Sequence, residues 1–296
     1  MEGSVDLHIH STASDGDLTP SEVVREAKRM GLRAIALTDH DTIDGCEEFF
    51  DEARKQDMEV LGGVEIGVAN DLQRGLKEVH VLAYFREGQD LYPLSKALEK
   101  LQESKCNWSE KQVALLEDKG FNVPYEEVLK VASDSPTVRR PHIWKVLDRY
   151  NEGSLKAQQY FEKTDFGGPW FVQKEFEMTI EETMEMISSS AAISVLAHPA
   201  LYGVWPDGAL NVVKIAREAG VQGVEAIYSY DFIGEGREFP SSKTVAERIK
   251  RELLHEKLLL TGGSDFHGSA NKKLALGCAK VPYQCFEALR AALSSS

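Results

Sequence analysis

Cysteine and long apolar runs are scarce in this 296-residue sequence, and basic residues are fewer than acidic ones. The four cysteines are widely spaced and form no Cys-x-x-Cys pair, which argues against a disulfide framework and a thiolate metal site. No segment approaches the roughly 20 apolar residues of a membrane-spanning helix, and residues 1–4 lack the basic and apolar pattern of a signal peptide. We therefore expect reduced thiols, no membrane partner and a cytoplasmic location.

Acidic residues outnumber basic ones, since 48 Asp and Glu face 34 Lys and Arg and the net charge is −14. Extended docking on duplex DNA depends on Lys and Arg that release counterions, and this charge balance argues against such a partner. A small anionic substrate is compatible with the sequence if its site is locally positive. With 42% hydrophobic and 28% charged residues, the composition is that of an ordinary folded protein.

Seven short apolar segments alternate with helical patterns along the chain. The expected strands are residues 5–9, 34–38, 60–68, 78–85, 192–197, 223–229 and 257–262, several of them rich in Val and Ile. This alternation is typical of parallel βαβ units, and about seven such strands favour closure into a barrel. The sequence therefore predicts an α/β fold with a barrel or a barrel-like sheet.

The alternation is interrupted once, between residues 88 and 178. There the sequence is polar and helical, with Leu94, Leu98 and Leu101 at helical spacing. We interpret this segment as a mostly helical insertion between the fourth and fifth strands. The predicted domains are a barrel of residues 1–87 and 179–296 and an insertion subdomain of residues 88–178.

Histidines and acids recur where the expected strands end. In DLHIHSTASDG, His8 and His10 are two positions apart, so a strand would direct both imidazoles to one side. Alone, this pair would be interpreted as two satisfied polar residues. Similar residues follow, however, in ALTDHD, GGVEIGV, EVHVLAY, SVLAHPA and LTGGSDFHG, and polar side chains in apolar strands are costly unless they are paired or bind a metal.

The carboxyl ends of parallel barrel strands open onto one face, so these residues are expected to meet there. Imidazole and carboxylate ligands suit Zn, Mn, Fe or Mg, and a buried Glu65 could bridge two ions. The candidate histidines and acids in these segments are His8, His10, Asp15, Asp39, His40, Asp41, Glu65, His80, His198, Asp265 and His267.

The ordered motifs DLHIHSTASDG, LTDHDT, GVEI, VHVLAY, AHPA and GSDFHG resemble those of the PHP (polymerase and histidinol phosphatase) superfamily of metal-dependent phosphoesterases. The resemblance covers nearly the whole chain and is less secure in the insertion. It implies a distorted (β/α)7 barrel with a mostly helical insertion between strands 4 and 5. It is most marked for stand-alone members that act on nucleoside 3',5'-bisphosphates and 5'-phosphorylated oligonucleotides.

The resemblance also implies two or three divalent metal ions in up to three sites. The first site would use His8, His10, Glu65 and Asp265. The second would use Glu65, His80 and His198, and the third Asp15, His40 and His267. A metal-bound hydroxide, held by the ligands of the first site, would attack the phosphorus of the substrate in line.

Substrate-binding donors are expected in the insertion, where TVRRPHIWKVL brings Arg139, Arg140 and His142 together before a helical run. The alternative interpretation of this segment is a solvated basic turn. Asp39 and Asp41 are interpreted as polar turn residues, with support of His40 from behind as the alternative.

The loop after the sixth expected strand, AIYSYDFIGEGREF, lacks a histidine. The resemblance implies a polar group there that contacts phosphate. Ser229, Tyr230 or Arg237 would supply this group. Because the loop lacks a histidine, the sequence determines the identity of the substrate less well than the metal chemistry.

The function predicted from these observations is hydrolysis of a phosphate monoester of a small nucleotide or of a 5'-phosphorylated oligonucleotide. Histidinol-phosphate hydrolysis is the alternative within the same chemistry. An amidohydrolase also begins with His-x-His, but the Asp-x-His of GSDFHG and the strand-borne Glu65 favour the phosphoesterase. A non-catalytic metal-binding module, like the barrel attached to some polymerases, is the weakest alternative because no polymerase-sized remainder accompanies the barrel.

Overall fold

The structure is a computed structural model that describes residues 4–230, 240–252, 258–268 and 275–295. Its eight strands form one sheet in the order β7-β6-β5-β4-β3-β2-β1-β8. The strands are β1 (Ser4–Asp6), β2 (Ala34–Leu37), β3 (Glu59–Gly67), β4 (His80–Phe85), β5 (Ile193–Leu196), β6 (Gly223–Tyr228), β7 (Leu259–Gly263) and β8 (Val281–Pro282). All seven expected strands are present, and the sequence analysis missed only the two-residue β8.

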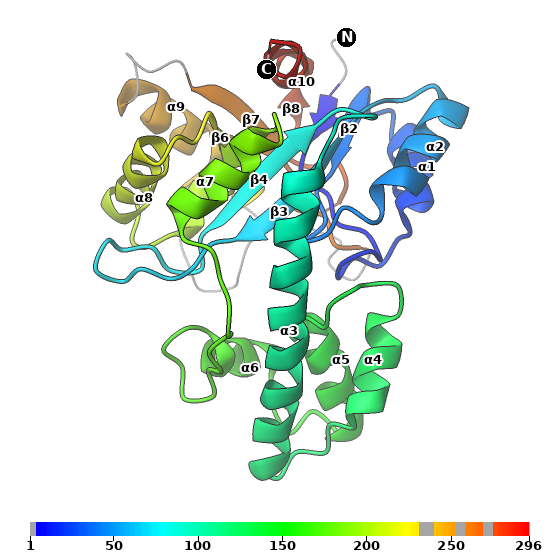
Figure 1. The fold of residues 1–296 in the computed structure, drawn as a ribbon, viewed down its shortest axis with the longest axis vertical. Coiled ribbons are helices and arrows are strands. Elements are labelled where there is room, and N and C mark those ends of the chain that lie inside the picture. Colours follow the sequence, from blue (N-terminus) through cyan, green and yellow to red (C-terminus); the bar gives the residue numbers. More distant parts are fainter. Residues whose placement is uncertain (1–3, 231–239, 253–257, 269–274, 296) are drawn as a thin grey trace.

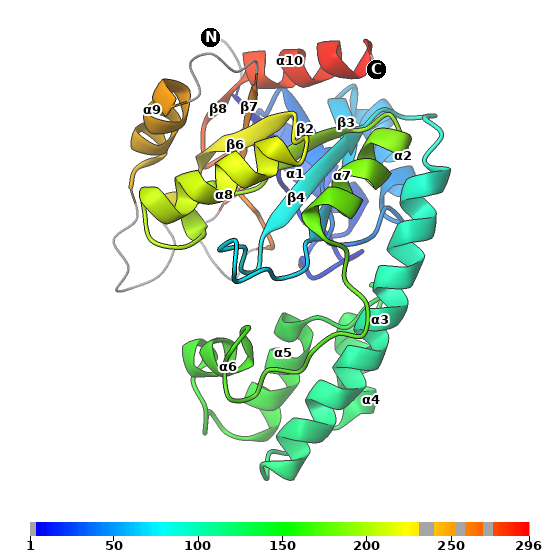
Figure 2. The same ribbon diagram turned by 60° about the vertical axis from the view of Figure 1, so that its left-hand side comes forward.

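The sheet curls into a nearly closed barrel (Figures 1 and 2). The segment after β1 returns to β7, because the Leu7 N–H donates to the Gly262 carbonyl at 3.2 Å and Ile9 forms a parallel bridge with Phe266. The short β8 pairs antiparallel with the other side of β1. The predicted α/β barrel with an insertion between the fourth and fifth strands is therefore confirmed.

Ten α-helices within the described residues surround or extend this sheet. They are α1 (Pro20–Arg29), α2 (Cys46–Gln56), α3 (Tyr92–Asp118), α4 (Tyr125–Ala132), α5 (Arg140–Tyr150), α6 (Ala157–Thr164), α7 (Ile180–Ser189), α8 (Asp207–Glu218), α9 (Ser242–Glu252) and α10 (Tyr283–Leu293). Thr19 begins α1 with a capping box, in which its side chain accepts from the Glu22 N–H and Glu22 accepts in return. In the described part of the chain, every helix is too short or too polar to span a membrane.

Strand β4 runs antiparallel to both of its neighbours, which corrects the prediction of an all-parallel barrel. The reason lies in the connection from β3, where Asp71 and Leu76 pair across a tight loop in place of a crossover helix. Antiparallel neighbours need no crossover. Because β4 is reversed, its first residue, His80, pairs with Gly67, the last residue of β3, and so reaches the face where β3 ends.

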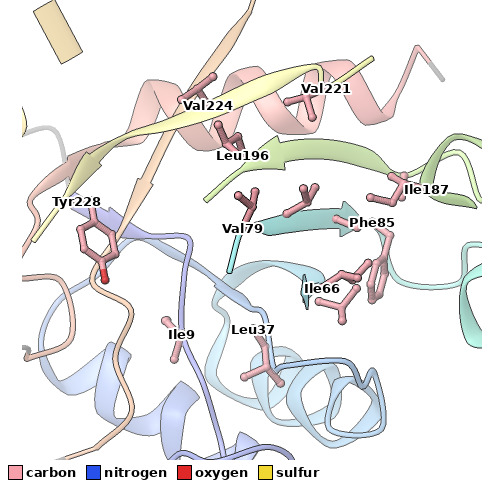
Figure 3. Close-up of a cluster of buried hydrophobic side chains, with 14 of the residues drawn as sticks. Ile9, Leu37, Ile66, Val79, Phe85, Ile187, Leu196, Val221, Val224 and Tyr228 are labelled. Atoms are coloured by element: carbon pink, nitrogen blue, oxygen red, sulfur yellow. The ribbon is translucent and has the colours of Figure 1, made fainter. Parts of the chain in front are cut away.

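Alternate residues of the strands enter two hydrophobic clusters. Ala34 and Ala36 of β2 face the barrel interior, which α10 closes at one end, whereas Ile35 and Leu37 face the outer helices. Figure 3 shows part of the outer cluster, with Leu37 among its labelled side chains. By the same alternation, Glu65 lies on the inward side of β3.

Helix α3 joins the barrel to the helices of the insertion. With 27 residues it is about 40 Å long, and Figure 1 shows it running from the sheet to α4, α5 and α6. The expected leucine stripe on its first half packs in the outer barrel cluster. Its second half contributes Trp108 and Leu116 to a third cluster formed with α4, α5 and α6.

Candidate metal centre

The predicted histidines and acids converge in the structure. Within each of three groups, one nitrogen or oxygen atom from every residue lies within 4.8 Å of the others. The groups are His10, Asp15, His40 and His267; His8, His10, Glu65 and Asp265; and His40, Glu65 and His80. The second group is the first site that the resemblance implied.

The other two groups differ from the implied sites in how they share histidines. His10 joins the group that was expected to contain only Asp15, His40 and His267. His40 takes the place expected for His198 beside Glu65 and His80. The side chain of His198 is nevertheless close, since its Nε2 lies 3.0 Å from Glu65 Oε1.

Glu65 is the centre of the cluster, because its two carboxylate oxygens contact five imidazoles. Oε1 lies 2.8 Å from His80 Nδ1 and 3.0 Å from His198 Nε2. Oε2 lies 3.0 Å from His40 Nδ1 and 3.3 Å from the Nε2 atoms of His8 and His10. The side chain is 1% exposed, so its carboxylate oxygens contact these imidazoles in place of water.

The backbone around the ligands is irregular and tightly constrained. His8 and His10 lie beyond the end of β1, yet their segment stays extended because the Asp265 N–H donates to the His8 carbonyl and the His10 N–H donates to the Phe266 carbonyl. His198 and Asp265 follow β5 and β7 with φ of 24° and 56°, values that non-glycine residues rarely adopt. A Cβ at Gly263 would lie 2.3 Å from the His8 Cβ, so only glycine fits beside this ligand.

Imidazoles and carboxylates attract one another within the cluster. Burial opposes ionisation of Glu65, but the histidines around it, His40 foremost, hold its pKa well below the usual range. Burial likewise opposes protonation of His8, yet the nearby carboxylates hold its pKa well above the usual range. For His267, Asp15 and Asp265 outweigh burial and raise the pKa to about 10.

The donor set fits divalent metal ions. Among the described residues, eight buried ligand atoms make no hydrogen bond, although several approach one another within 3.4 Å. They are His8 Nε2, His10 Nδ1 and Nε2, Asp15 Oδ1, His40 Nδ1, Glu65 Oε2, His198 Nδ1 and Asp265 Oδ1. Buried polar atoms are rarely left unsatisfied. Four of these atoms, His8 Nε2, His10 Nε2, Glu65 Oε2 and Asp265 Oδ1, approach one another within 3.4 Å without hydrogen-bond geometry, as metal ligands do.

Asp39 and Asp41 are more than the polar turn residues that the sequence analysis favoured. Asp39 is buried and accepts from the Ser11 N–H at 2.7 Å and from the Ser14 hydroxyl, which fixes the loop that carries Asp15. Asp41 is buried and pairs with Lys105 of α3 and with Arg139 at 2.9 Å. Both acids therefore stabilise the surroundings of the cluster.

Lys105 was not identified from the sequence, because a lysine on a polar helix normally faces solvent. Burial, with a contribution from Arg139, lowers the pKa of this ammonium to about 7. The Gln102 amide, one turn earlier on α3, donates to the Asp41 carbonyl at 2.9 Å. The docking of α3 on the barrel thus brings Lys105 and Arg139 together around Asp41. No local sequence pattern predicts this arrangement.

The cluster lies at one wall of a cavity of about 590 Å³ between the barrel and the insertion. Asp15, Glu65 and Asp265 line it on the barrel side, and Arg139 and Arg140 line it on the insertion side. The predicted arginines thus face the predicted ligands. Both arginines are paired with acids, Arg139 with Asp41 and Asp15 and Arg140 with Asp165 and Glu78.

His142 is placed differently from the two arginines. Its side chain is buried and lies outside the cavity wall that the described residues form. Its Nδ1 accepts from the Arg139 N–H at 3.2 Å at the start of α5. Burial lowers the pKa of His142 to about 4.

This lowered pKa predicts a loss of stability in acid. Because folding depresses the pKa of His142, its contribution is complete above the unfolded value of 6.5 and is lost as the pH falls toward about 4. We expect the free energy of unfolding of the metal-free protein to fall by about 3 kcal/mol more in the wild type than in His142→Gln over this range. Denaturant titrations at several pH values measure the difference, and parallel curves for the two proteins would contradict it.

Two of the three residues proposed for the loop after β6, Ser229 and Tyr230, do not line the cavity. Ser229 is buried, with its hydroxyl 2.9 Å from the Cys278 sulfur. Tyr230 is buried too, and its hydroxyl accepts from the Ala200 N–H at 3.2 Å. Arg237 lies outside the described residues. Burial of these two side chains in the barrel wall keeps both of them out of the cavity lining.

Comparison with known proteins gives one family and several relatives. The PHP domain family profile matches residues 6–195. Over 228 residues, which are 76% of this chain and 79% of the relative, the chain is 30% identical to the 5'-3' exoribonuclease of Haemophilus influenzae. It is 27% identical to the phosphoribosyl 1,2-cyclic phosphate 1,2-diphosphodiesterase of Eggerthella lenta, covering 89% of this chain and 94% of the relative.

A further relative and a solved structure cover most of the chain. The 3',5'-nucleoside bisphosphate phosphatase of Chromobacterium violaceum is 26% identical, over 89% of this chain and 87% of the relative. A structure from Bifidobacterium adolescentis, described as a metal-dependent phosphoesterase, superposes with a TM-score of 0.79 over 99% of this chain and 97% of the other at 21% identity. At that identity the superposition shows the shared fold.

Proposed function

The chain belongs to the PHP family of metal-dependent phosphoesterases, and from that premise we propose that it hydrolyses a phosphate monoester of a small nucleotide or of a 5'-phosphorylated oligonucleotide. A nucleoside 3',5'-bisphosphate is the substrate that we test first. The observation that carries the proposal is the cluster around Glu65, which faces two arginines across one cavity.

The cavity suits a small phosphorylated molecule in size and in lining. Its volume of about 590 Å³ is in the range of sites for small ligands. Trp108, Phe161 and Phe171 add apolar surface on the insertion side, where an organic leaving group would lie. The cations on the same side offer charge-assisted hydrogen bonds to phosphate oxygens, which explains how a protein of net charge −14 could hold an anion.

We propose that the nine candidate ligands hold two or three divalent ions, with Glu65 shared between sites. When bound, such ions neutralise charge on a phosphate ester and acidify water. The residues around them keep the ligands in place and hold the substrate. Arg139 and Arg140 would bind the phosphate or a second anionic group, and His142 would act indirectly by fixing the Arg139 backbone.

We also propose the division of the chain into a barrel of residues 1–87 and 179–296 and an insertion subdomain of residues 88–178. The separate hydrophobic cluster of α4, α5 and α6 supports it. The cavity lies between the two parts, so the insertion would select the substrate while the barrel holds the ions. The proposal places the enzyme in the cytoplasm, where free cysteines such as those of the described chain stay reduced.

A panel of substrates, each assayed with Mn, Mg, Zn and Fe, tests the proposed function. We expect phosphate release from 3'-phosphoadenosine 5'-phosphate and from 5'-phosphorylated oligonucleotides to exceed release from histidinol phosphate. The Glu65→Gln variant, purified in the same way, controls for contaminating phosphatases. Preference for histidinol phosphate would select the alternative phosphatase, and cleavage of a cyclic amide without any phosphate release would overturn the assignment.

The Arg140→Ala variant tests whether Arg140 binds the substrate. Loss of a charge-assisted hydrogen bond is expected to raise KM for a bisphosphate by about tenfold, with a much smaller effect on p-nitrophenyl phosphate. Lys145→Ala is the matched control, because Lys145 is on the same helix and pairs with Asp17 at 3.1 Å but does not line the cavity. Equal changes of KM for both substrates would remove Arg140 from substrate binding.

A further inference from the structure

Glu225 is a buried carboxylate that has no place among the candidate metal ligands. It is the third residue of β6 and is 0% exposed. Its neighbours Val224 and Ala226 face the outer cluster, so Glu225 faces the barrel interior. A buried carboxylate is costly unless its hydrogen-bond partners compensate for the loss of water, and its partners therefore indicate its role.

The carboxylate of Glu225 contacts two candidate ligands that come from different strands. His8 Nδ1 lies 3.1 Å from Oε1 and 3.2 Å from Oε2. The backbone N–H of His198 donates to Oε2 at 2.8 Å. The Glu225 side chain thus contacts both the ring of His8 and the backbone of the turn at His198.

These contacts determine which nitrogen of His8 is free to bind a metal. An ionised carboxylate only accepts hydrogen bonds, so a hydrogen bond between Glu225 and His8 requires the proton to be on Nδ1. The other nitrogen, Nε2, faces Glu65 Oε2 at 3.3 Å and Asp265 Oδ1 at 3.4 Å. Within the described residues, Nε2 makes no hydrogen bond.

We propose that Glu225 is a positioning residue of the metal centre, which fixes the ring of His8 with Nε2 toward the ions and holds the turn at His198. The backbone of His198 has φ of 24°, and such conformations persist only where surrounding contacts impose them. The hydrogen bond from the His198 N–H to Glu225 is one such contact. The inference rests on the proposed metal centre and names a residue outside its ligand set.

Metal binding to Glu225→Gln tests this role directly. Glutamine keeps the shape of the side chain but offers one acceptor oxygen to two donors, so its amide must face either His8 Nδ1 or the His198 N–H. We expect zinc affinity, measured by competition with a chromophoric chelator, to fall by about 10- to 100-fold, the usual cost of losing a partner of a metal-bound histidine. Ser194→Ala is the control, because the hydroxyl of buried Ser194 on β5 bonds only Gln222 within the described residues, and its loss should leave the zinc affinity unchanged.

The protonation of His8 gives a second readout, which needs no Glu225 variant to fold. In the zinc-loaded wild-type protein labelled with ¹⁵N-histidine, we expect the His8 signal, assigned from its loss in His8→Gln, to show a protonated Nδ1 and a metal-bound Nε2. A metal-bound Nδ1, or an affinity of Glu225→Gln equal to that of the wild type, would overturn the positioning role while leaving the metal centre intact. Absence of bound zinc from the wild type would overturn the centre itself, and the inference with it.

Discussion

Glu65→Gln is expected to lower kcat/KM for a phosphate ester by at least about a thousandfold. The Glu65 carboxylate contacts five imidazoles within 3.3 Å, so its substitution affects five candidate ligands at once. Neutralising it removes one anionic side chain from the proposed metal ligands and presents an amide N–H₂ to imidazole nitrogens that need an acceptor or an ion. Metal ions contribute several kcal/mol of charge stabilisation in such reactions, and each 1.36 kcal/mol is tenfold in rate.

The control for this change lies on the same strand. Glu59 begins β3 at the far end of the barrel, where its carboxylate accepts from the Tyr283 hydroxyl at 2.8 Å and from Arg290 at 2.7 Å. Glu59→Gln removes an equal charge from β3 without touching the cluster and should keep wild-type activity. Metal content, measured by mass spectrometry, should fall only in Glu65→Gln. A Glu65→Gln enzyme that keeps a tenth or more of the wild-type activity would contradict the central role of this residue.

The sequence contained most of the information on the fold because the barrel strands are short, apolar and bounded by loops. What it could not specify was the direction of β4. A buried strand has the same apolar pattern whether its neighbours are parallel or antiparallel. The reversal lies in the connection between β3 and β4, where Asp71 and Leu76 pair with each other and no helix forms. The eighth strand was missed because two residues, one of them Pro282, carry no periodic signal.

The candidate ligands could be identified from the sequence because histidine and carboxylate are conspicuous in apolar strands. The same signal was available for Glu225 in GVEAIY and for Asp6 in SVDLHI. Asp6 is buried as well and accepts from the Ser264 and Gly277 N–H groups, which ties the start of the chain to the segment after β7. Glu225 has no histidine motif at the end of its own strand, and Asp6 opens the motif DLHIHSTASDG but was passed over in favour of the histidines that follow it.

The contacts between the insertion and the barrel could not be predicted. Lys105 and Arg139 are separated by 34 positions and meet only because α3 and the start of α5 both reach Asp41. Long-range pairing of this kind depends on the docking of whole helices. Local periodicity places each residue on a helix or turn and leaves its partner undetermined, which is why a solvated turn was a reasonable alternative for the two arginines.

Removal of metal ions is expected to abolish hydrolysis completely, and their return is expected to restore it and to stabilise the fold. Any ligand that binds only the folded state adds stability as its concentration rises above Kd, about 4 kcal/mol at a thousandfold excess. Because residues from β1, β3, β4, β5 and β7 or the loops beside them surround the same point, ions would tie distant parts of the chain together. Thermal unfolding with and without added Mn or Zn measures the gain.

The pH dependence of metal binding distinguishes ions bound by the histidine cluster from ions bound adventitiously elsewhere. In the metal-free protein, the raised pKa of His267, about 10, means that its contribution to stability is complete below the unfolded value of 6.5 and is lost as the pH rises toward 10. Metal ions must displace such protons from the imidazoles, so their affinity should increase with pH through this same window. Calorimetric titrations in two buffers of different ionisation enthalpy should detect proton release at neutral pH. Tight binding without proton release would show that the ions occupy some other site and that these histidines are not the ligands.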